Sequence, residues 1–179
     1  TALRLAGADV LELEDSLCPA PGAPEGAIAT AGQMAEQPDF EMLNQYANGA
    51  NPEAHYRTTG PEIWHQTSGR VTHFVAGLGT CGTINGSGKF LKEQNENVQI
   101  IGVHPPAGHD IPGVRSLEQL SQTEFFTPEA YDGLVEVGND PAFEMCQRLN
   151  QEESIPAAPS SGMALAGAFD SIADEPGNV

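Results

Sequence analysis

Short apolar runs alternate with helix-like segments along the 179 residues of the chain. Apolar runs of strand length, rich in Val and Ile, are typical of buried strands in a parallel sheet. Their alternation with amphipathic helical patterns predicts an α/β fold. The expected strands cover residues 8–13, 71–77, 98–104 and 133–138. The expected helices cover residues 27–36, 51–69, 83–93, 140–150 and 163–173.

Proline and glycine mark the expected loops and helix ends. Asn51-Pro52-Glu53 combines a capping residue, a first-turn proline and a first-turn acid, so a helix is expected to start there. Gly60 is expected to restart or kink that helix, and Gly69 to end it. Residues 19–26 and most of residues 105–132 are expected to be loop, the latter with short helical turns.

The chain is strongly acidic, with 25 Asp and Glu against 7 Lys and Arg and a formal net charge of −18. Nucleic acid or an anionic membrane would repel such a surface, so neither is an expected partner. The acids are spread along the chain, which indicates either an ordinary solvated surface or adaptation to a high-salt cytoplasm. No apolar run approaches the roughly 20 residues of a membrane span, and no secretory signal pattern is present, so we expect a cytoplasmic protein.

The metal and disulfide patterns are weak. Cys18, Cys81 and Cys146 are odd in number and lack CxxC spacing. The five histidines show no HExxH motif or paired ligand spacing. Neither a metal site nor a disulfide framework is predicted.

The most distinctive stretch is GLGTCGTINGSG, residues 77–88, between an expected strand and an expected helix. Strand, glycine turn and helix together aim free backbone N–H groups and a helix dipole at an anion. Residues 77–82 satisfy GxGxxG, but a dinucleotide site also expects an acid at the end of the next strand, where this chain has His104-Pro105-Pro106. Residues 79–83 add two threonine hydroxyls, which suits a terminal phosphate monoester. The alternative is a glycine turn that only packs the helix on the strand.

Four stretches together resemble the cysteine synthase family of pyridoxal-phosphate enzymes of fold type II. The first two are residues 44–64, with NQY and NPEAHYRTTGPEIW, and the loop GTCGT at 79–83. The others are HDIPGVR at 109–115 and PSSG at 159–162. This resemblance implies a three-layer α/β/α fold with pyridoxal 5′-phosphate as cofactor. Residues 46–179 would form most of the large cofactor-binding domain, truncated at its end, and residues 1–45 the last part of the small N-terminal domain.

The resemblance also implies an activity. The expected reaction is β-replacement on an activated serine, O-acetylserine or O-phosphoserine, by sulfide to give L-cysteine, in a homodimer. One alternative is a cystathionine β-synthase-like condensation with homocysteine. A second, from another class, is a non-catalytic cofactor-binding or scaffold protein.

Site residues follow from the matched motifs. The resemblance assigns cofactor phosphate binding to Gly79, Thr80, Cys81, Gly82 and Thr83, where Cys81 replaces the usual glycine and must turn its side chain away. It assigns a hydrogen bond with the cofactor ring nitrogen to Ser160. It assigns substrate binding to Gln45, Gly113 and Arg115. For Gln45 the alternative is a solvated loop residue, and for Arg115 an exposed side chain paired with Glu118.

The lysine that forms an imine with the cofactor in this family has no match here. The two lysines of the chain, Lys89 and Lys92, both lie on the helix that follows the phosphate loop. Neither is expected to reach the cofactor aldehyde, so no catalytic residue is assigned. The chain is therefore expected to be an internal fragment whose lysine lies upstream, and to be inactive alone.

Overall fold

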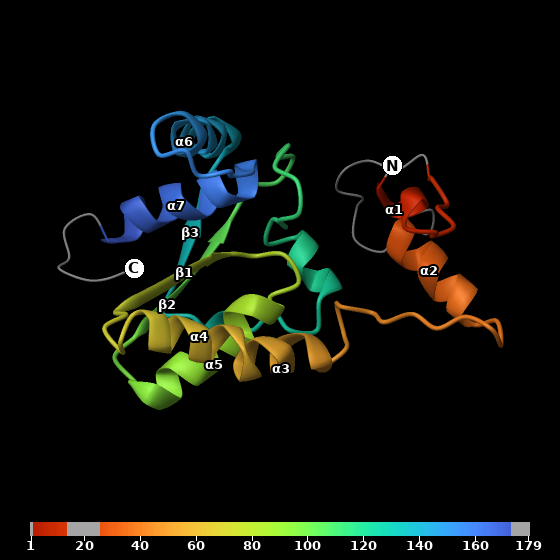
Figure 1. Cartoon of the computed structure of the whole chain (residues 1–179), viewed down its shortest axis with the longest axis horizontal. Coiled ribbons are helices and arrows are strands. Elements are labelled where there is room, and N and C mark those ends of the chain that lie inside the picture. The colour runs from red at the N-terminus through yellow and green to blue at the C-terminus, as the bar shows by residue number, and fades with distance from the viewer. Residues whose placement is uncertain (1, 14–25, 173–179) are drawn as a thin grey trace. The chain divides into compact units, whose positions relative to one another are not determined.

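The computed structural model describes residues 2–13 and 26–172 of the chain (Figure 1). Contacts divide the chain into two compact units, Thr1–Met42 and Leu43–Val179. The boundary predicted between residues 45 and 46 stays a prediction for the domains of the synthase fold.

The first unit contains two helices, α1 (Ala2–Leu5) and α2 (Ala27–Ala35). The predicted helix over residues 27–36 is confirmed. The predicted strand over residues 8–13 is wrong, because these residues form no ladder and are mostly exposed. A strand needs a neighbour for its backbone groups, and the described part of this unit contains no other strand. Residues 19–25 of the expected loop lie outside the described residues.

The second unit alternates helices with parallel strands. Its elements in chain order are α3 (Ala50–Arg57), α4 (Thr59–Gln66), β1 (His73–Gly77), α5 (Gly82–Gln94), β2 (Gln99–His104), η1 (Gln119–Gln122), η2 (Pro128–Ala130), β3 (Gly133–Glu136), α6 (Asn139–Gln151) and α7 (Pro159–Ile172). Two short 3₁₀ turns, η1 and η2, occupy the region predicted to be loop with short helix.

The three strands form one parallel sheet in the order β1-β2-β3. Val75 pairs with Ile101 in the first ladder, and Val103 with Val135 in the second. Sequential parallel strands joined by helices are βαβ units, so the predicted α/β class is confirmed.

Helices cover both faces of this sheet (Figure 1). Phe74 and Ala76 of β1 pack toward α5, and Val75 between them packs toward α7, as alternate strand residues must. The core on the α5 side consists of Val71, Leu78, Cys81, Ile84, Leu91, Val98, Ile100 and Leu120. The core on the α7 side consists of Val103, Ile111, Val114, Val137, Ala142, Met163 and Ala166. Helices α3 and α4 pack on α5, and α6 packs on α7.

Two predicted helix boundaries are wrong. The break between α3 and α4 lies at Thr58, which has φ −123° and ψ −69°, rather than at Gly60. Gly60 lies inside α4, where an added Cβ would come 2.8 Å from the Cβ of Phe90, so close packing explains this glycine. The last helix begins at Pro159 rather than at residue 163, since proline is well tolerated in a first helical turn. Residue 173 lies outside the described part.

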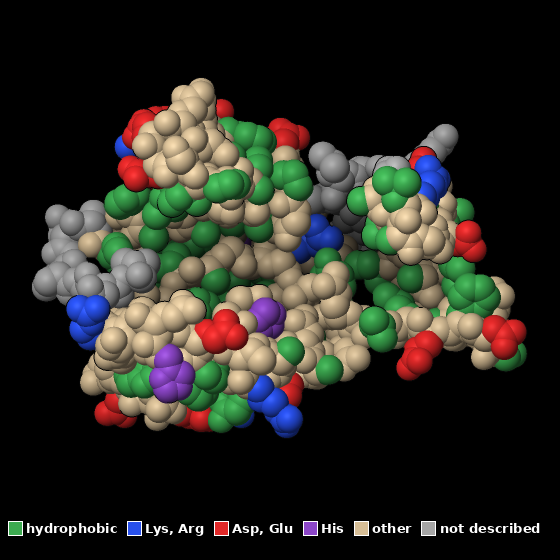
Figure 2. Space-filling model, in the orientation of Figure 1, with side chains coloured by type: hydrophobic (Ala, Val, Ile, Leu, Met, Phe, Trp, Pro, Cys, Tyr) green, Lys and Arg blue, Asp and Glu red, His purple; other side chains and the backbone are tan. Residues whose placement is uncertain are grey.

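Acidic side chains are dispersed on the face of the molecule in Figure 2, where they lie over α6 and over the layer of α3 to α5. They form no single patch on that face. No helix in residues 2–13 or 26–172 is long and apolar enough to cross a membrane.

Candidate functional site

The glycine loop connects β1 to α5 at the carboxyl edge of the sheet. Leu78 begins it with two backbone bonds: its N–H donates to the Val103 carbonyl at 2.8 Å, and its carbonyl accepts from the Arg115 N–H at 2.8 Å. Leu78 itself is fully buried. The loop is therefore fixed to the neighbouring strand and to the segment at residues 109–115 before α5 begins.

Cys81, the residue immediately before α5, has an unusual backbone conformation. Its φ of 68° and ψ of 3° are left-handed, a region that costs a residue with a Cβ about 1 kcal/mol or more. Its side chain is buried in the core on the α5 side, where packing offsets this cost. Burial raises the pKa of the thiol to about 11, and a hydrogen bond with Tyr131 only partly opposes this. A thiol that stays protonated at neutral pH is a structural group rather than a nucleophile.

Two glycines allow backbone and side chains to approach the loop closely. A Cβ on Gly79 would come 2.8 Å from the Gly113 carbonyl oxygen, and Gly113 itself has a left-handed φ of +82°. A Cβ on Gly82 would overlap the side-chain amide of Asn51. Any larger residue would push apart the segments that form the site.

A pocket of about 350 Å³ opens beside this loop. It is lined by Gln45, Tyr46, Gly77, Gly79, Thr80, Cys81, Thr83, Ile84, Gly113 and Arg115. The structure thus brings together predicted residues from three segments, the loop and the chain around residues 45 and 113. Gly82 lies directly under the loop, buried as the first residue of α5.

Both loop threonines are held by neighbours. The Thr80 hydroxyl accepts from Asn51 Nδ2 at 3.0 Å and from the Gly82 N–H at 3.3 Å. The Thr80 carbonyl accepts from the Thr123 hydroxyl at 2.7 Å. The Thr83 hydroxyl lies 3.1 Å from His55 Nε2.

Arg115 brings positive charge to the pocket. Its Nη2 donates to the Tyr46 hydroxyl at 2.9 Å, and its guanidinium carbon lies 5.8 Å from the centre of the Tyr46 ring. Tyr46 is in turn fixed by its carbonyl, which accepts from the Glu124 N–H at 2.9 Å. The planar guanidinium is thereby held over an aromatic face, an arrangement that suits recognition of an anion.

The site fits a phosphate group. The helix α5 has 13 residues and carries no acid in its first turn, so its dipole and free N–H groups face the loop without a competing negative charge. Two threonine hydroxyls and the Arg115 guanidinium surround the same pocket. Helix amides, hydroxyls and an arginine are the usual protein donors to a phosphate monoester.

Comparisons with known proteins identify the family. The family model for pyridoxal-phosphate dependent enzymes matches residues 1–178. The chain belongs to the pyridoxal-phosphate dependent enzyme family. It is 45% identical over 142 residues to cysteine synthase B of Pseudomonas aeruginosa, covering 79% of this chain and 48% of that protein. It is 41% identical over 155 residues to cysteine synthase B of Salmonella typhimurium, covering 87% of this chain and 51% of that protein.

A solved structure is also similar to this chain. A hydrogen sulfide-producing enzyme from Fusobacterium nucleatum superposes with a TM-score of 0.73 at 28% identity, over 79% of this chain and 50% of its own. These matches confirm the predicted relation to cysteine synthases, the predicted fold and the predicted cofactor. The chain spans about half the length of the curated relatives that it matches.

Ser160, predicted to meet the cofactor ring, does not line the pocket. It lies half-buried in the first turn of α7. Met163 in the next turn reaches the pocket wall, since its methyl carbon is 3.2 Å from where a Cβ on Gly77 would lie. The role of Ser160 in this pyridoxal-phosphate enzyme therefore stays a prediction.

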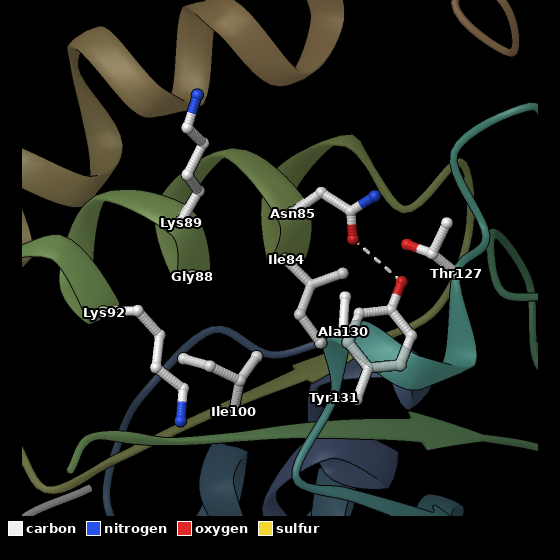
Figure 3. Close-up of a pocket in the computed structure, with 9 residues that line it drawn as sticks. All are labelled: Ile84, Asn85, Gly88, Lys89, Lys92, Ile100, Thr127, Ala130 and Tyr131. Atoms are coloured by element: carbon white, nitrogen blue, oxygen red, sulfur yellow. Dashed lines mark hydrogen bonds between the residues drawn. The ribbon is translucent and has the colours of Figure 1, made fainter. Parts of the chain in front are cut away.

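The two lysines lie at a different cavity, of about 210 Å³, beside α5 (Figure 3). Lys89 extends from α5 toward α3, with its ammonium 4.9 Å from the centre of the Tyr56 ring. Lys92 forms an ion pair with Asp132 at 2.8 Å. The Tyr131 hydroxyl donates to Asn85 Oδ1 at 2.8 Å across the same cavity. Neither lysine lines the pocket beside the glycine loop.

Sequence reasoning missed the side chains that support the loop. Asn51 and His55 were recognised only as part of a motif, although their spacing places them on one face of a helix. Thr123 carried no sequence signal, because Thr80, whose carbonyl accepts from the Thr123 hydroxyl, lies 43 residues away along the chain.

Proposed function

We propose that the protein containing this chain is a cysteine synthase. It would replace the β-substituent of an activated serine with sulfide and release L-cysteine. The observation that carries the proposal is the pocket in which the phosphate loop, Gln45 and Arg115 meet, in a chain whose relatives bear that name. A cystathionine β-synthase-like reaction is not favoured, because these relatives are named cysteine synthase.

The phosphate loop would hold the cofactor. When bound, pyridoxal 5′-phosphate supplies an electron sink that stabilises negative charge at the substrate Cα while the β-substituent leaves. The hydroxyls of Thr80 and Thr83, with the backbone N–H groups at the start of α5, would bind its phosphate. Cys81 would contribute only backbone, because its side chain is buried in the core.

The substrate would bind in the same pocket, beside Gln45, Gly113 and Arg115. Gln45 is exposed there and offers an amide N–H to a carboxylate. The backbone carbonyl of Gly113 lies close to Gly79 at the edge of this pocket. Arg115 would place its charge beside the departing β-substituent. Homodimer formation and a cytoplasmic location remain predictions of the same proposal.

An activity assay tests the proposal. The intact protein with pyridoxal 5′-phosphate would be given O-acetylserine or O-phosphoserine together with sulfide or homocysteine. We expect cysteine with sulfide and no cystathionine with homocysteine. Absence of cysteine with both donors would exclude the synthase and favour the non-catalytic alternative.

Loss of a loop hydroxyl is expected to weaken cofactor binding. Each charge-assisted hydrogen bond is worth about 1.5–3 kcal/mol, so Thr80→Ala and Thr83→Ala should each raise the dissociation constant roughly ten- to a hundredfold. Titration of cofactor into the intact protein measures this. Thr127→Ala, an exposed threonine at the other cavity, is the control and should leave affinity unchanged. Unchanged affinity in both loop variants would remove the loop from its proposed role.

Arg115 is expected to select the serine donor. A guanidinium binds a phosphate leaving group through charge and paired N–H groups, whereas an acetyl ester offers only a neutral acceptor. Arg115→Ala should therefore lower kcat/KM for O-phosphoserine by about tenfold or more, the equivalent of one charge-assisted bond, and spare O-acetylserine. Arg57→Ala, which removes an exposed arginine paired with Glu53, is the control and should leave kcat/KM for both donors unchanged. An equal loss with both donors would contradict phosphate recognition.

A further inference from the structure

Two polar residues of α3 each contact one threonine of the phosphate loop. Asn51 reaches Thr80 and His55 reaches Thr83, at 3.0 and 3.1 Å. The two residues are four positions apart, so they lie on the same face of α3. Both are half-buried, and this face of α3 packs on α5.

The orientation of the Asn51 amide is fixed by a neighbour that can only accept. Its Nδ2 donates to the Gln45 carbonyl at 2.7 Å, so the atom there must be the nitrogen. The second hydrogen of that nitrogen then points to the Thr80 hydroxyl oxygen. Because this oxygen also accepts from the Gly82 N–H at 3.3 Å, both of its lone pairs are used. The Thr80 proton is left to be donated to a further acceptor, and Thr80 lines the pocket.

A parallel chain of contacts ends at Thr83. The Thr59 hydroxyl lies 2.9 Å from His55 Nδ1, and the Thr83 hydroxyl lies 3.1 Å from His55 Nε2. If Thr59 donates to Nδ1, the ring carries its proton on Nε2 and donates to the oxygen of Thr83. The Thr83 proton is then available to the pocket. In the opposite tautomer Thr83 would donate to the ring and turn a lone pair toward the bound anion.

We propose that Asn51 and His55 are positioning residues, which direct the hydroxyl protons of Thr80 and Thr83 at the phosphate of the cofactor. This inference rests on the proposed function, because it takes the anion in the pocket to be that phosphate. A hydroxyl whose proton is already directed outward binds an anion without reorganising, whereas a misdirected one presents a lone pair to negative charge. The helix α3 thus acts on the cofactor through the loop and does not touch it.

The test compares pyridoxal 5′-phosphate with pyridoxal, which lacks the phosphate. The measured quantity is the ratio of their dissociation constants in the intact protein, because general damage to the pocket affects both ligands alike. Asn51→Ala and His55→Ala should each reduce the preference for the phosphorylated ligand by about tenfold, the equivalent of one hydrogen bond to a charged group. His55→Gln, which keeps an N–H donor near the position of Nε2, should retain most of the preference.

Matched controls separate positioning from packing. Tyr56→Phe removes another link between α3 and α5, the bond from the Tyr56 hydroxyl to Glu93 at 2.7 Å, and should leave the ratio unchanged. In a Thr80→Ala background, Asn51→Ala should cause no further loss, because its target hydroxyl is gone. If Asn51→Ala does not fold, the same cycle with His55→Ala and Thr83→Ala carries the test.

The outcomes are distinct. An unchanged ratio in both alanine variants, or the same loss from Asn51→Ala with and without the Thr80 hydroxyl, would overturn the inference and leave the proposed function standing. A wild-type protein that binds both ligands equally would instead refute the phosphate role of the loop, and this inference with it.

Discussion

Gly86→Ala is expected to destabilise the protein by about 3 kcal/mol or more, at the upper end for overpacked sites. Gly86 is buried in α5 where α3 crosses it. An added Cβ would overlap the carbonyl oxygen of Pro52 and lie 2.8 Å from the Cβ of His55. The obstacle is mainly backbone, so only a displacement of α3 from α5 can relieve it. Urea denaturation of the intact protein, followed by circular dichroism, measures the loss.

Gly88→Ala is the matched control. Gly88 lies on the same helix as Gly86, and replacing either glycine with alanine improves helix propensity by close to 1 kcal/mol. The Cβ added at Gly88 would meet only side-chain atoms of Ile100, at 3.2 Å or more, and a shift of a few tenths of an ångström relieves this contact. The free energy of unfolding of Gly88→Ala should therefore change little or rise. Equal losses in the two variants would show that the close packing of α3 on α5 is not what requires Gly86.

Gly86→Ala should also weaken cofactor binding. Displacing α3 moves Asn51 and His55 away from Thr80 and Thr83, so the loop loses the two side-chain supports that α3 provides. We expect cofactor affinity to fall in Gly86→Ala at a temperature where the protein is still folded.

The second large effect is a complete absence of synthase activity in residues 1–179 alone. The reaction needs a lysine at the cofactor aldehyde to bind the cofactor covalently and to move the α-proton. Lys89 contacts the Tyr56 ring and Lys92 pairs with Asp132, and neither lines the pocket of the phosphate loop. The measurement is cysteine formation from either serine donor and sulfide, with circular dichroism used to confirm that the sample is folded.

Variants of the intact protein provide the control. Lys89→Arg and Lys92→Arg should leave its activity unchanged, because both residues lie at the other cavity (Figure 3). Any cysteine formation by the isolated chain would contradict this account. If that activity disappeared when Lys89→Arg or Lys92→Arg was introduced into the isolated chain, one of these lysines would have to reach the cofactor.

Much of the second unit could be predicted because its local signals agree with one another. The strands around Val75 and Val103 are short apolar runs between helical patterns. Because helices cover both faces of the sheet, side chains on both faces of these strands must be apolar. The segment at residues 8–13 has a similar apolar pattern, yet the described chain offers it no partner strand. A sequence pattern reports which side chains suit a strand, and the neighbour that completes the ladder comes from tertiary structure.

The candidate site also contains some residues whose positions could be predicted from the sequence and others whose positions could not. The positions of Gly79, Thr80 and Thr83 at the turn between a strand and a helix could be predicted, because this turn is a local motif. Gln45, Gly113 and Arg115 came only from a family resemblance, and the structure places them beside the loop. The supports of the loop were not predictable, because Asn51 lies 29 residues from Thr80 and His55 lies 28 from Thr83.

The central claim is that residues 79–83 hold the phosphate of pyridoxal 5′-phosphate. A crystal structure of the intact protein grown with this cofactor tests it most directly. The account predicts phosphate oxygens within hydrogen-bond distance, about 2.5–3.0 Å, of the hydroxyls of Thr80 and Thr83, with the side chain of Cys81 still in the core. A phosphate bound elsewhere, for example beside Lys92 and Tyr131 at the other cavity, would contradict it.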